Sequence, residues 1–143
     1  MAKLTYGSAY FSGTPVETTL VADTPAKAAG DTTAMQLSGF TMPAHNRLTY
    51  TDATTRVFSV TFAGSMFKGS GTGSDVTMYL YKNGSVIPGG WIDRRVPGSD
   101  TGAFAVTAQV SLDQDDYVEL WVANDSGDDI SVVAGAMTVA VLG

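Results

Sequence analysis

The feature that most constrains this chain is a two-residue alternation of large apolar side chains with small or polar ones. It recurs in short runs, at residues 58–62, 76–81, 104–112 and 117–122. Successive side chains of a β-strand point to opposite faces, so this alternation predicts strands that each bury one face. Short strands separated by turn-forming residues favour an antiparallel β-sandwich or barrel. We therefore expect an all-β fold with little or no helix.

Clusters of Gly, Asn and Asp separate these runs. Asn83-Gly84 lies between two of them and predicts a two-residue hairpin, because both residue types tolerate a positive φ. Asp113–Asp116 joins the next pair of runs. Within the last apolar run, residues 130–142, Gly135 marks a candidate β-bulge.

The first third of the chain is less regular. Residues 5–11 and 15–22 resemble strands, and residues 22–30 are long enough for only a single helical turn. No linker and no fixed-period repeat divides the chain. We expect one domain, in which residues 1–46 form an extended segment that packs on residues 47–143 or on a partner.

Composition excludes several classes of function. The net charge is −6 with only 8 Lys and Arg residues, so the chain is expected to bind neither nucleic acid nor an anionic membrane. The absence of Cys removes thiol chemistry and disulfides. No run approaches the roughly 20 apolar residues of a membrane span, and residues 1–7 lack the apolar core of a secretory signal. We expect a protein made in the cytoplasm that stays soluble or assembles there.

Bulky rings occupy strand positions that should face water. Tyr79 and Tyr81 project from one predicted strand, and Tyr117 and Trp121 from another. If the two strands are neighbours, the rings form an exposed aromatic patch, which usually marks an interaction site. We predict that these four residues form a subunit interface. The alternative is that the N-terminal segment covers them, or that they simply stabilise the sheet as cross-strand pairs.

Two other groups are candidate partner contacts. Trp91 with Arg94 and Arg95 combines the residue types enriched in binding hot spots. The competing interpretation is that Trp91 ends a strand while both Arg residues pair with nearby Asp. The second group lies in the N-terminal segment and comprises Tyr6, Tyr10 and Phe11.

No catalytic constellation is apparent. His45, the single His, lies beside Pro43 and Asn46 and is interpreted as a turn residue and not as a general base. Only Glu17 and Glu119 are Glu, and the Asp residues cluster in turns, where their side chains bond nearby backbone N–H groups. We expect that the protein is not an enzyme and needs no cofactor.

Calcium is the one metal ion that the Asp-rich loops suggest. Two Asp-rich loops could supply its 6–8 oxygen ligands if they converged, although neither has an EF-hand spacing. Turn chemistry is the preferred interpretation, and no metal site is predicted. The acidic residues concerned are Asp113, Asp115, Asp116, Asp125, Asp128 and Asp129. The Gly-rich stretch 69–73 lacks the Lys of a phosphate-binding loop and is interpreted as a flexible connection.

The order of the strand-like blocks, at residues 56–62, 76–84, 106–112 and 116–124, resembles the superfamily of trimeric jelly rolls that includes tumour necrosis factor and the complement globular heads. The resemblance covers about two-thirds of the chain. It implies an antiparallel jelly-roll sandwich and a homotrimer packed around a three-fold axis. It implies no catalytic residues.

The N-terminal blocks, residues 6–11 and 46–51, resemble small phage virion proteins that carry the same jelly roll. This resemblance implies a head decoration or cement protein, located in the virion, that stabilises the capsid through protein–protein contacts. Its expected partners are its own copies and the major capsid protein or another virion protein. The alternative is a receptor- or carbohydrate-binding tip domain of a phage fibre.

Overall fold

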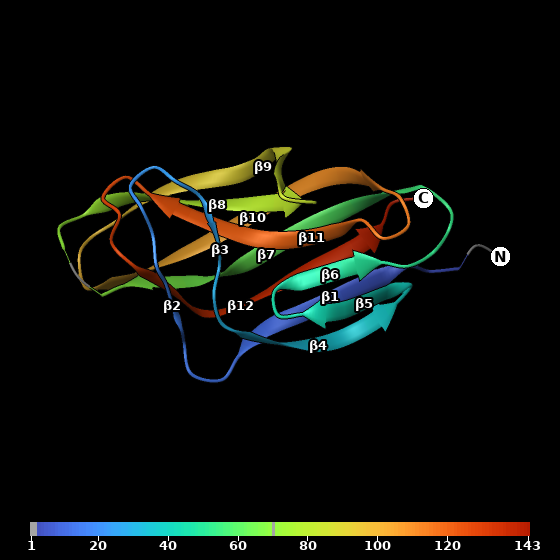
Figure 1. The fold of residues 1–143 in the computed structure, drawn as a ribbon, viewed down its shortest axis with the longest axis horizontal. Helices are drawn as coiled ribbons and strands as arrows, with labels where there is room; N and C mark the ends of the chain where they lie inside the picture. Colours follow the sequence, from blue (N-terminus) through green and yellow to red (C-terminus); the bar gives the residue numbers. More distant parts are fainter. Residues whose placement is uncertain (1–2, 70) are drawn as a thin grey trace.

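A computed structural model describes residues 3–69 and 71–143. Met1 and Ala2 lie outside the described residues, and so does Ser70, which belongs to the predicted flexible connection 69–73. The described chain forms twelve strands and no helix, which confirms the all-β prediction. The strands build two antiparallel sheets packed face to face (Figure 1). No helix in this part of the chain could cross a membrane.

One sheet, here named the β7 sheet, has the order β10-β7-β12-β1-β4, with β2 paired to β12. Its strands are β1 (Tyr6–Ser12), β2 (Glu17–Thr18), β4 (Asp31–Ser38), β7 (Arg56–Lys68), β10 (Asp100–Leu112) and β12 (Ile130–Val141). The other, the β8 sheet, has the order β5-β6-β11-β8-β9, with β3 paired to β11. Its strands are β3 (Ala26–Lys27), β5 (Phe40–Ala44), β6 (Arg47–Tyr50), β8 (Ser74–Lys82), β9 (Ser85–Val96) and β11 (Tyr117–Asn124).

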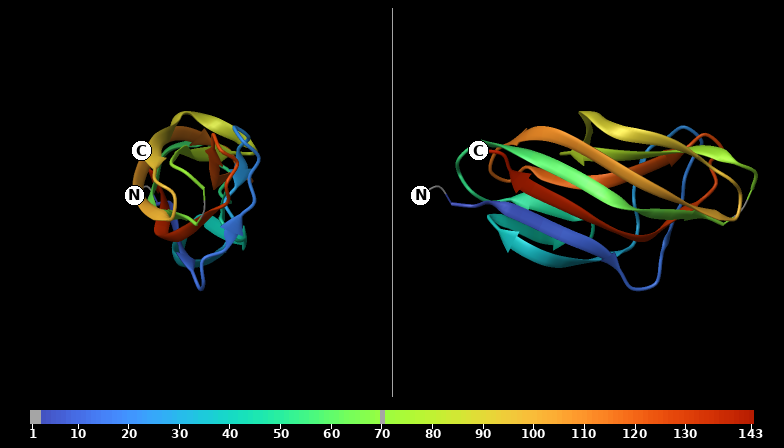
Figure 2. Two further views of the ribbon diagram at one scale, coloured as in Figure 1. Left: turned by 90° about the vertical axis from the view of Figure 1, so that its left-hand side faces the viewer. Right: turned by 180° about the vertical axis from the view of Figure 1, so that it is seen from behind.

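The core fills the space between the sheets. Alternate residues of β7, such as Phe58 and Phe62, face alternate residues of β8 and β11, such as Leu80 and Leu120, and all four are fully buried. At one end the ring of Tyr50 lies 5.0 Å from that of Phe58 and 5.4 Å from that of Phe40. The left view of Figure 2, along the long axis of the molecule, shows the two sheets curving around this interior.

The N-terminal segment takes part in both sheets. Residues 6–44 supply β1 to β5, and β1 lies between β12 and β4 inside the β7 sheet. Residues 22–30, which could have formed a single helical turn, contain β3 instead, and just before it Val21 forms an isolated bridge with Thr24. The first described residues and the C-terminus lie at the same end of the sandwich (Figures 1 and 2).

A buried asparagine side chain completes the β8 sheet where β3 and β6 leave a gap. The Asn46 side chain, 2% exposed, donates to the carbonyls of Leu120 (2.8 Å) and Ala28 (3.0 Å). Its Oδ1 accepts the Leu120 N–H at 2.9 Å. The side chain therefore satisfies the Leu120 N–H and shares the Leu120 carbonyl with the Ala28 N–H, which bonds it at 3.0 Å, so that both backbone groups of Leu120 are paired in this gap. Asn also tolerates the φ of 55° found here.

The turn chemistry agrees with the sequence. Asn83 and Gly84 have φ of 50° and 83° and join β8 to β9 in the predicted two-residue hairpin. The predicted bulge in β12 is also present, because the pairing register with β7 shifts between Val132 and Ala134, next to Gly135. Gly135 lies directly opposite Gly64 of β7.

This glycine pair allows β7 and β12 to approach closely. A Cβ added to Gly64 would lie 2.3 Å from the Ala134 carbonyl oxygen and 2.8 Å from the Gly135 Cα. Both obstacles are backbone atoms, which cannot move aside as a flexible side chain can. The bulge thus depends on Gly at position 64.

We expect Gly64→Ala to lower the free energy of unfolding by about 1–3 kcal/mol, because the added methyl group must displace a strand. Chemical denaturation followed by circular dichroism measures the change. Gly73→Ala is the matched control, since its Cβ would meet only the mobile end of Arg95, at 3.2 Å. Equal stability of Gly64→Ala and the control would contradict this account.

Candidate interaction surfaces

The predicted aromatic residues meet on the outer face of the β8 sheet. Strands β8 and β11 are neighbours, and Tyr79 lies directly opposite Trp121. The Tyr81 ring stacks on the Trp121 indole, with 4.3 Å between centroids and 7° between planes. It also contacts the Tyr79 ring edge-on, at 5.9 Å. The two strands are thus neighbours, the condition on which the predicted aromatic patch depended, and these three rings lie together.

Tyr117 stands slightly apart, under the guanidinium of Arg47, whose Cζ lies 4.0 Å from the ring centroid. All four predicted rings are half-buried, and part of their cover comes from one another and from Arg47. This packing is what cross-strand aromatic pairs achieve without a partner. The assignment of the four residues to a subunit interface stays a prediction.

Beneath the rings lies a carboxylate that is almost fully buried. Glu119 is 2% exposed and receives hydrogen bonds from Arg47 Nε (2.8 Å) and Trp121 Nε1 (3.1 Å). Lys27 Nζ lies 2.9 Å from Glu119 Oε2, the oxygen that also accepts the bond from Arg47. Burial raises the pKa of Glu119, but the bonds from Lys27, Trp121 and Arg47 outweigh it and hold the pKa below its ordinary value. The charged Glu119 thus ties β3, β6 and the Trp121 ring to β11.

The neighbouring phenol responds in the opposite direction. Partial burial of Tyr81, together with the nearby Tyr79, raises the pKa of Tyr81 above its ordinary value. Tyr81 therefore stays protonated and neutral, as a ring stacked on an indole should be.

Trp91 extends the aromatic patch to β9. It lies directly opposite Tyr79 and is 52% exposed. Arg95 pairs with Asp75 at 3.4 Å, whereas Arg94 donates to the Ala103 carbonyl at 2.9 Å. Trp91 lies within β9 and not at its end, and the three candidate residues point to different neighbours.

The N-terminal candidates divide between two faces. Tyr6 and Tyr10, 37% and 41% exposed, lie on the outer face of β1. Phe11 faces the interior, where its ring meets that of Phe62 edge-on at 6.0 Å.

The outside of the β7 sheet carries an uncharged surface that was not predicted from the sequence. Its residues align in three rows that cross β10, β7, β12 and β1, and no member is charged. The rows are Gln109, Ser59, Ala140 and Tyr6; Thr107, Thr61, Thr138 and Ser8; and Ala105, Ala63, Ala136 and Tyr10. We name these twelve residues the uncharged face. Its signal in the sequence is the lack of Lys, Glu and Asp at the solvent-side positions of four strands, where such residues are normal.

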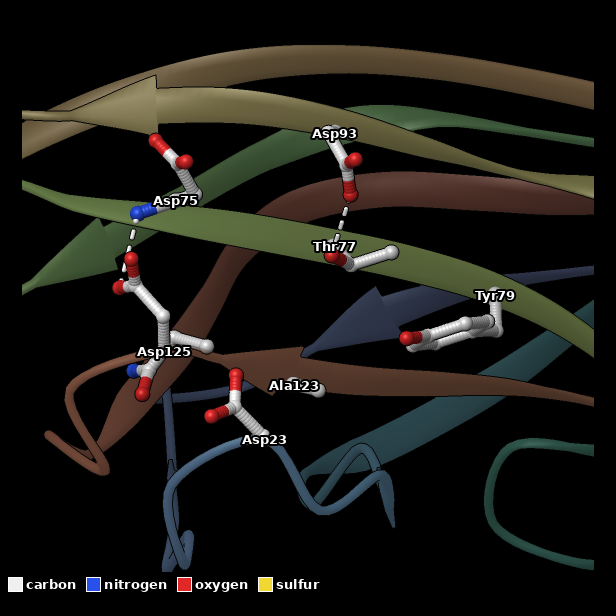
Figure 3. A pocket seen from close by; sticks show the side chains of 8 residues that line it. Asp23, Asp75, Thr77, Tyr79, Asp93, Ala123 and Asp125 are labelled. Atoms are coloured by element: carbon white, nitrogen blue, oxygen red, sulfur yellow. Dashed lines mark hydrogen bonds between the residues drawn. The ribbon is translucent and has the colours of Figure 1, made fainter.

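An acidic pocket opens beside the aromatic patch (Figure 3). It encloses about 240 Å³ and is bounded by β8, β9 and the loops next to β11. Its lining residues are Asp23, Asp75, Thr77, Tyr79, Asp93, Ala123, Asn124 and Asp125. Of these, only Asp125 belongs to the loops considered for calcium.

The two Asp-rich loops lie at opposite ends of β11 and so do not converge. Asp116 accepts from Asn83 Nδ2 and lies 3.2 Å from Lys82 Nζ. Asp128 lies 2.7 Å from the buried Lys68 Nζ, and hydrogen bonds from Lys68 and Ser126 lower the pKa of its carboxyl. Within residues 3–69 and 71–143 no group of three or more His, Cys, Asp or Glu is arranged to hold a metal ion.

His45 lies in the turn between β5 and β6, as expected. Its Nδ1 is 2.9 Å from the Thr32 N–H, and its Nε2 is 3.5 Å from Asp31. The ring thus links the turn to β4.

We expect Glu119→Gln to lower the free energy of unfolding by about 1–3 kcal/mol at neutral pH, because the amide cannot replace the charge between Lys27 and Arg47. The lowered pKa of Glu119 means that its charge stabilises the fold above pH 4.5, its ordinary value, and less as the pH falls through the lowered pKa. The difference between wild type and variant should therefore narrow below pH 4.5.

Denaturant unfolding at several pH values measures this difference. Glu17→Gln, on the exposed side of β2, is the control and should change little at any pH. A difference that stays constant down to pH 2 would contradict the assigned role of Glu119.

Several solved structures have a similar fold. The chain is similar to Eiger TNF from S. frugiperda, with a TM-score of 0.68 and 13% identity over 98% of this chain and 93% of that one. It is also similar to the PRD1 vertex protein P5, with a TM-score of 0.65 and 12% identity over 99% and 100% of the two chains. The globular domain of zebrafish complement 1qA gives a TM-score of 0.57 and 12% identity over 99% and 98%.

No protein-family model and no curated protein sequence matches this chain. At 12–13% identity, the solved structures establish the fold alone. The two antiparallel sheets and these similarities together show that the chain has the jelly-roll sandwich fold that is also found in tumour necrosis factor and the complement globular heads.

Proposed function

We propose that this protein is a structural component of a phage particle, and that it assembles as a homotrimer which decorates and stabilises the capsid. The observation that carries the proposal is the uncharged face. Three rows of four residues cross the outside of the β7 sheet without a single charge, although the chain carries 22 charged residues, 8 basic and 14 acidic.

An uncharged face of small side chains is suited to contact with another protein surface. Ala, Ser and Thr let two backbones approach closely, and no charged group has to be desolvated when they do. Tyr6 and Tyr10 at its edge add larger rings that can fill space between subunits. The resemblance to trimeric jelly rolls supplies the three-fold symmetry of the proposal.

Two outer faces compete for the trimer contact, the uncharged face and the aromatic patch. We favour the uncharged face, because the rings of the patch already pack on one another and on Arg47. Charged side chains also surround the patch, including Lys27, Asp93 and Lys82. Burying the patch between subunits would require these charges to be paired or displaced.

The proposed location is a virion. The similar fold of the PRD1 vertex protein P5 supports this location, because a vertex protein is part of a particle. In the proposed role the protein acts passively, without catalysis. The trimer would lie across joints between shell subunits and oppose their separation by burying apolar area, at about 25 cal/mol per Å².

A fibre-tip domain that binds a receptor or a carbohydrate is the second candidate, and the exposed Trp91 beside Tyr79 favours it. Particles that lack the protein separate the two roles. Heads that infect normally but break on heating or osmotic shock support decoration. Stable particles that fail to adsorb to cells support a fibre tip.

We expect the purified protein to have three times the 14.9 kDa mass of one chain in multi-angle light scattering at micromolar concentration. Ala105→Glu should convert it to a folded monomer, because the residue is exposed in one chain but its charge would be buried without a partner in the trimer. Ser85→Glu, in the β8–β9 hairpin, is the control and should remain trimeric.

Tyr79→Ser tests the competing face. Dissociation by Tyr79→Ser, with Ala105→Glu still trimeric, would move the contact to the aromatic patch. A monomeric wild-type protein would overturn the trimer itself. Circular dichroism confirms in each case that the variant retains its β-structure.

A further inference from the structure

A row of three aromatic side chains crosses the outer face of the β8 sheet. Trp91 of β9 lies opposite Tyr79 of β8, which in turn lies opposite Trp121 of β11. Exposure decreases along the row, from 52% at Trp91 to half-buried rings at the other two positions. The row faces away from the β7 sheet, so a trimer built on the uncharged face leaves it open.

The acidic pocket adjoins this row, and Tyr79 belongs to both. Figure 3 shows the Tyr79 ring at one side of the pocket and carboxylates from separate segments around the remainder. The segments are the loop before β3, the strands β8 and β9, and the loop after β11. Their carboxylates are those of Asp23, Asp75, Asp93 and Asp125.

The pocket carries an excess of negative charge. Asp75 pairs with the cation Arg95 at 3.4 Å. Asp93 instead accepts a hydrogen bond from the Thr77 hydroxyl, and Asp125 accepts one from the Asp75 N–H at 3.0 Å. Four carboxylates with one paired guanidinium leave a surface complementary to a positive charge next to aromatic rings.

From this juxtaposition we infer that the aromatic row and its pocket form a docking site for an arginine-bearing segment of a partner protein. A guanidinium group stacks on aromatic faces and bonds carboxylates through parallel N–H groups, so it matches both walls of the pocket at once. A neutral sugar would use the rings but leave the carboxylates uncompensated. A nucleic acid would be repelled by them. We take this partner to be another virion protein, and in this one respect the inference rests on the proposed function.

The chain provides its own reporter. Its two Trp residues both belong to the aromatic row, so intrinsic tryptophan fluorescence reports on this face alone. We expect acetylated and amidated triarginine to change the fluorescence saturably at low ionic strength. Trilysine should bind at least threefold more weakly, and triglutamate should produce no saturable change.

Matched variants test the pocket. Asp93→Asn/Asp125→Asn keeps an oxygen acceptor at both positions but removes two charges, and should weaken triarginine binding at least tenfold. Asp100→Asn/Asp115→Asn removes the same charge from exposed sites outside the pocket and should change binding less than twofold. If the pocket variant unfolds at a lower temperature than wild type, Trp91→Ala is the deciding variant. Its triarginine binding, followed by the fluorescence of the remaining Trp121, should be at least threefold weaker than that of wild type.

Several results would overturn the inference. They are no saturable response to triarginine, equal weakening in both double variants, and saturation by the neutral sugar maltohexaose in place of triarginine. Light scattering on the same samples separates this test from the trimer. Triarginine binding by a monomeric protein would leave the docking site standing while the proposed assembly fails.

Discussion

The register that aligns β10, β7, β12 and β1 decides both faces of the β7 sheet at once. Side chains alternate along a strand, so the pairing that places Phe62 and Val139 in the core places Ala63 and Thr138 outside. A shift by one residue would bury small side chains and expose the large ones. The close approach of Gly64 and Gly135 helps to fix this register. The same strand register therefore fixes both the residues of the uncharged face and those of the core.

The two outer faces differ in chemistry, and this difference suggests different tasks. The uncharged face carries hydroxyl, amide and methyl groups but no charge that a contact would have to desolvate, which suits permanent contact between copies. On the β8 sheet, rings lie among charges, and the Trp121 indole is held by the buried Glu119. Such a mixed surface suits recognition of a second protein. One small domain can thus present one face to its own copies and another to a partner.

Much of this fold could be predicted from the sequence, because strand alternation and the Asn83-Gly84 turn are local signals. The alternating runs also predicted that Tyr81 and Trp121 point outward, but their adjacency depended on β8 and β11 being neighbours. Pairing order could not be deduced, since hydrogen bonds between β1 and β12 join residues far apart in the chain. The uncharged face was missed for this reason: absent charges on separate strands matter only once those strands are known to be neighbours. The roles of Asn46 and Glu119 likewise depend on tertiary contacts.

The most direct test of this account asks whether the uncharged face is covered in solution. The chain has no Cys, so Thr138→Cys places a single small thiol in the middle row, and Ser85→Cys places one in an exposed hairpin. Reaction with a thiol reagent at native pH should be at least tenfold slower for Thr138→Cys than for Ser85→Cys, and the rates should converge after denaturation. Equal rates in protein of trimeric mass would contradict a subunit contact through the β7 sheet.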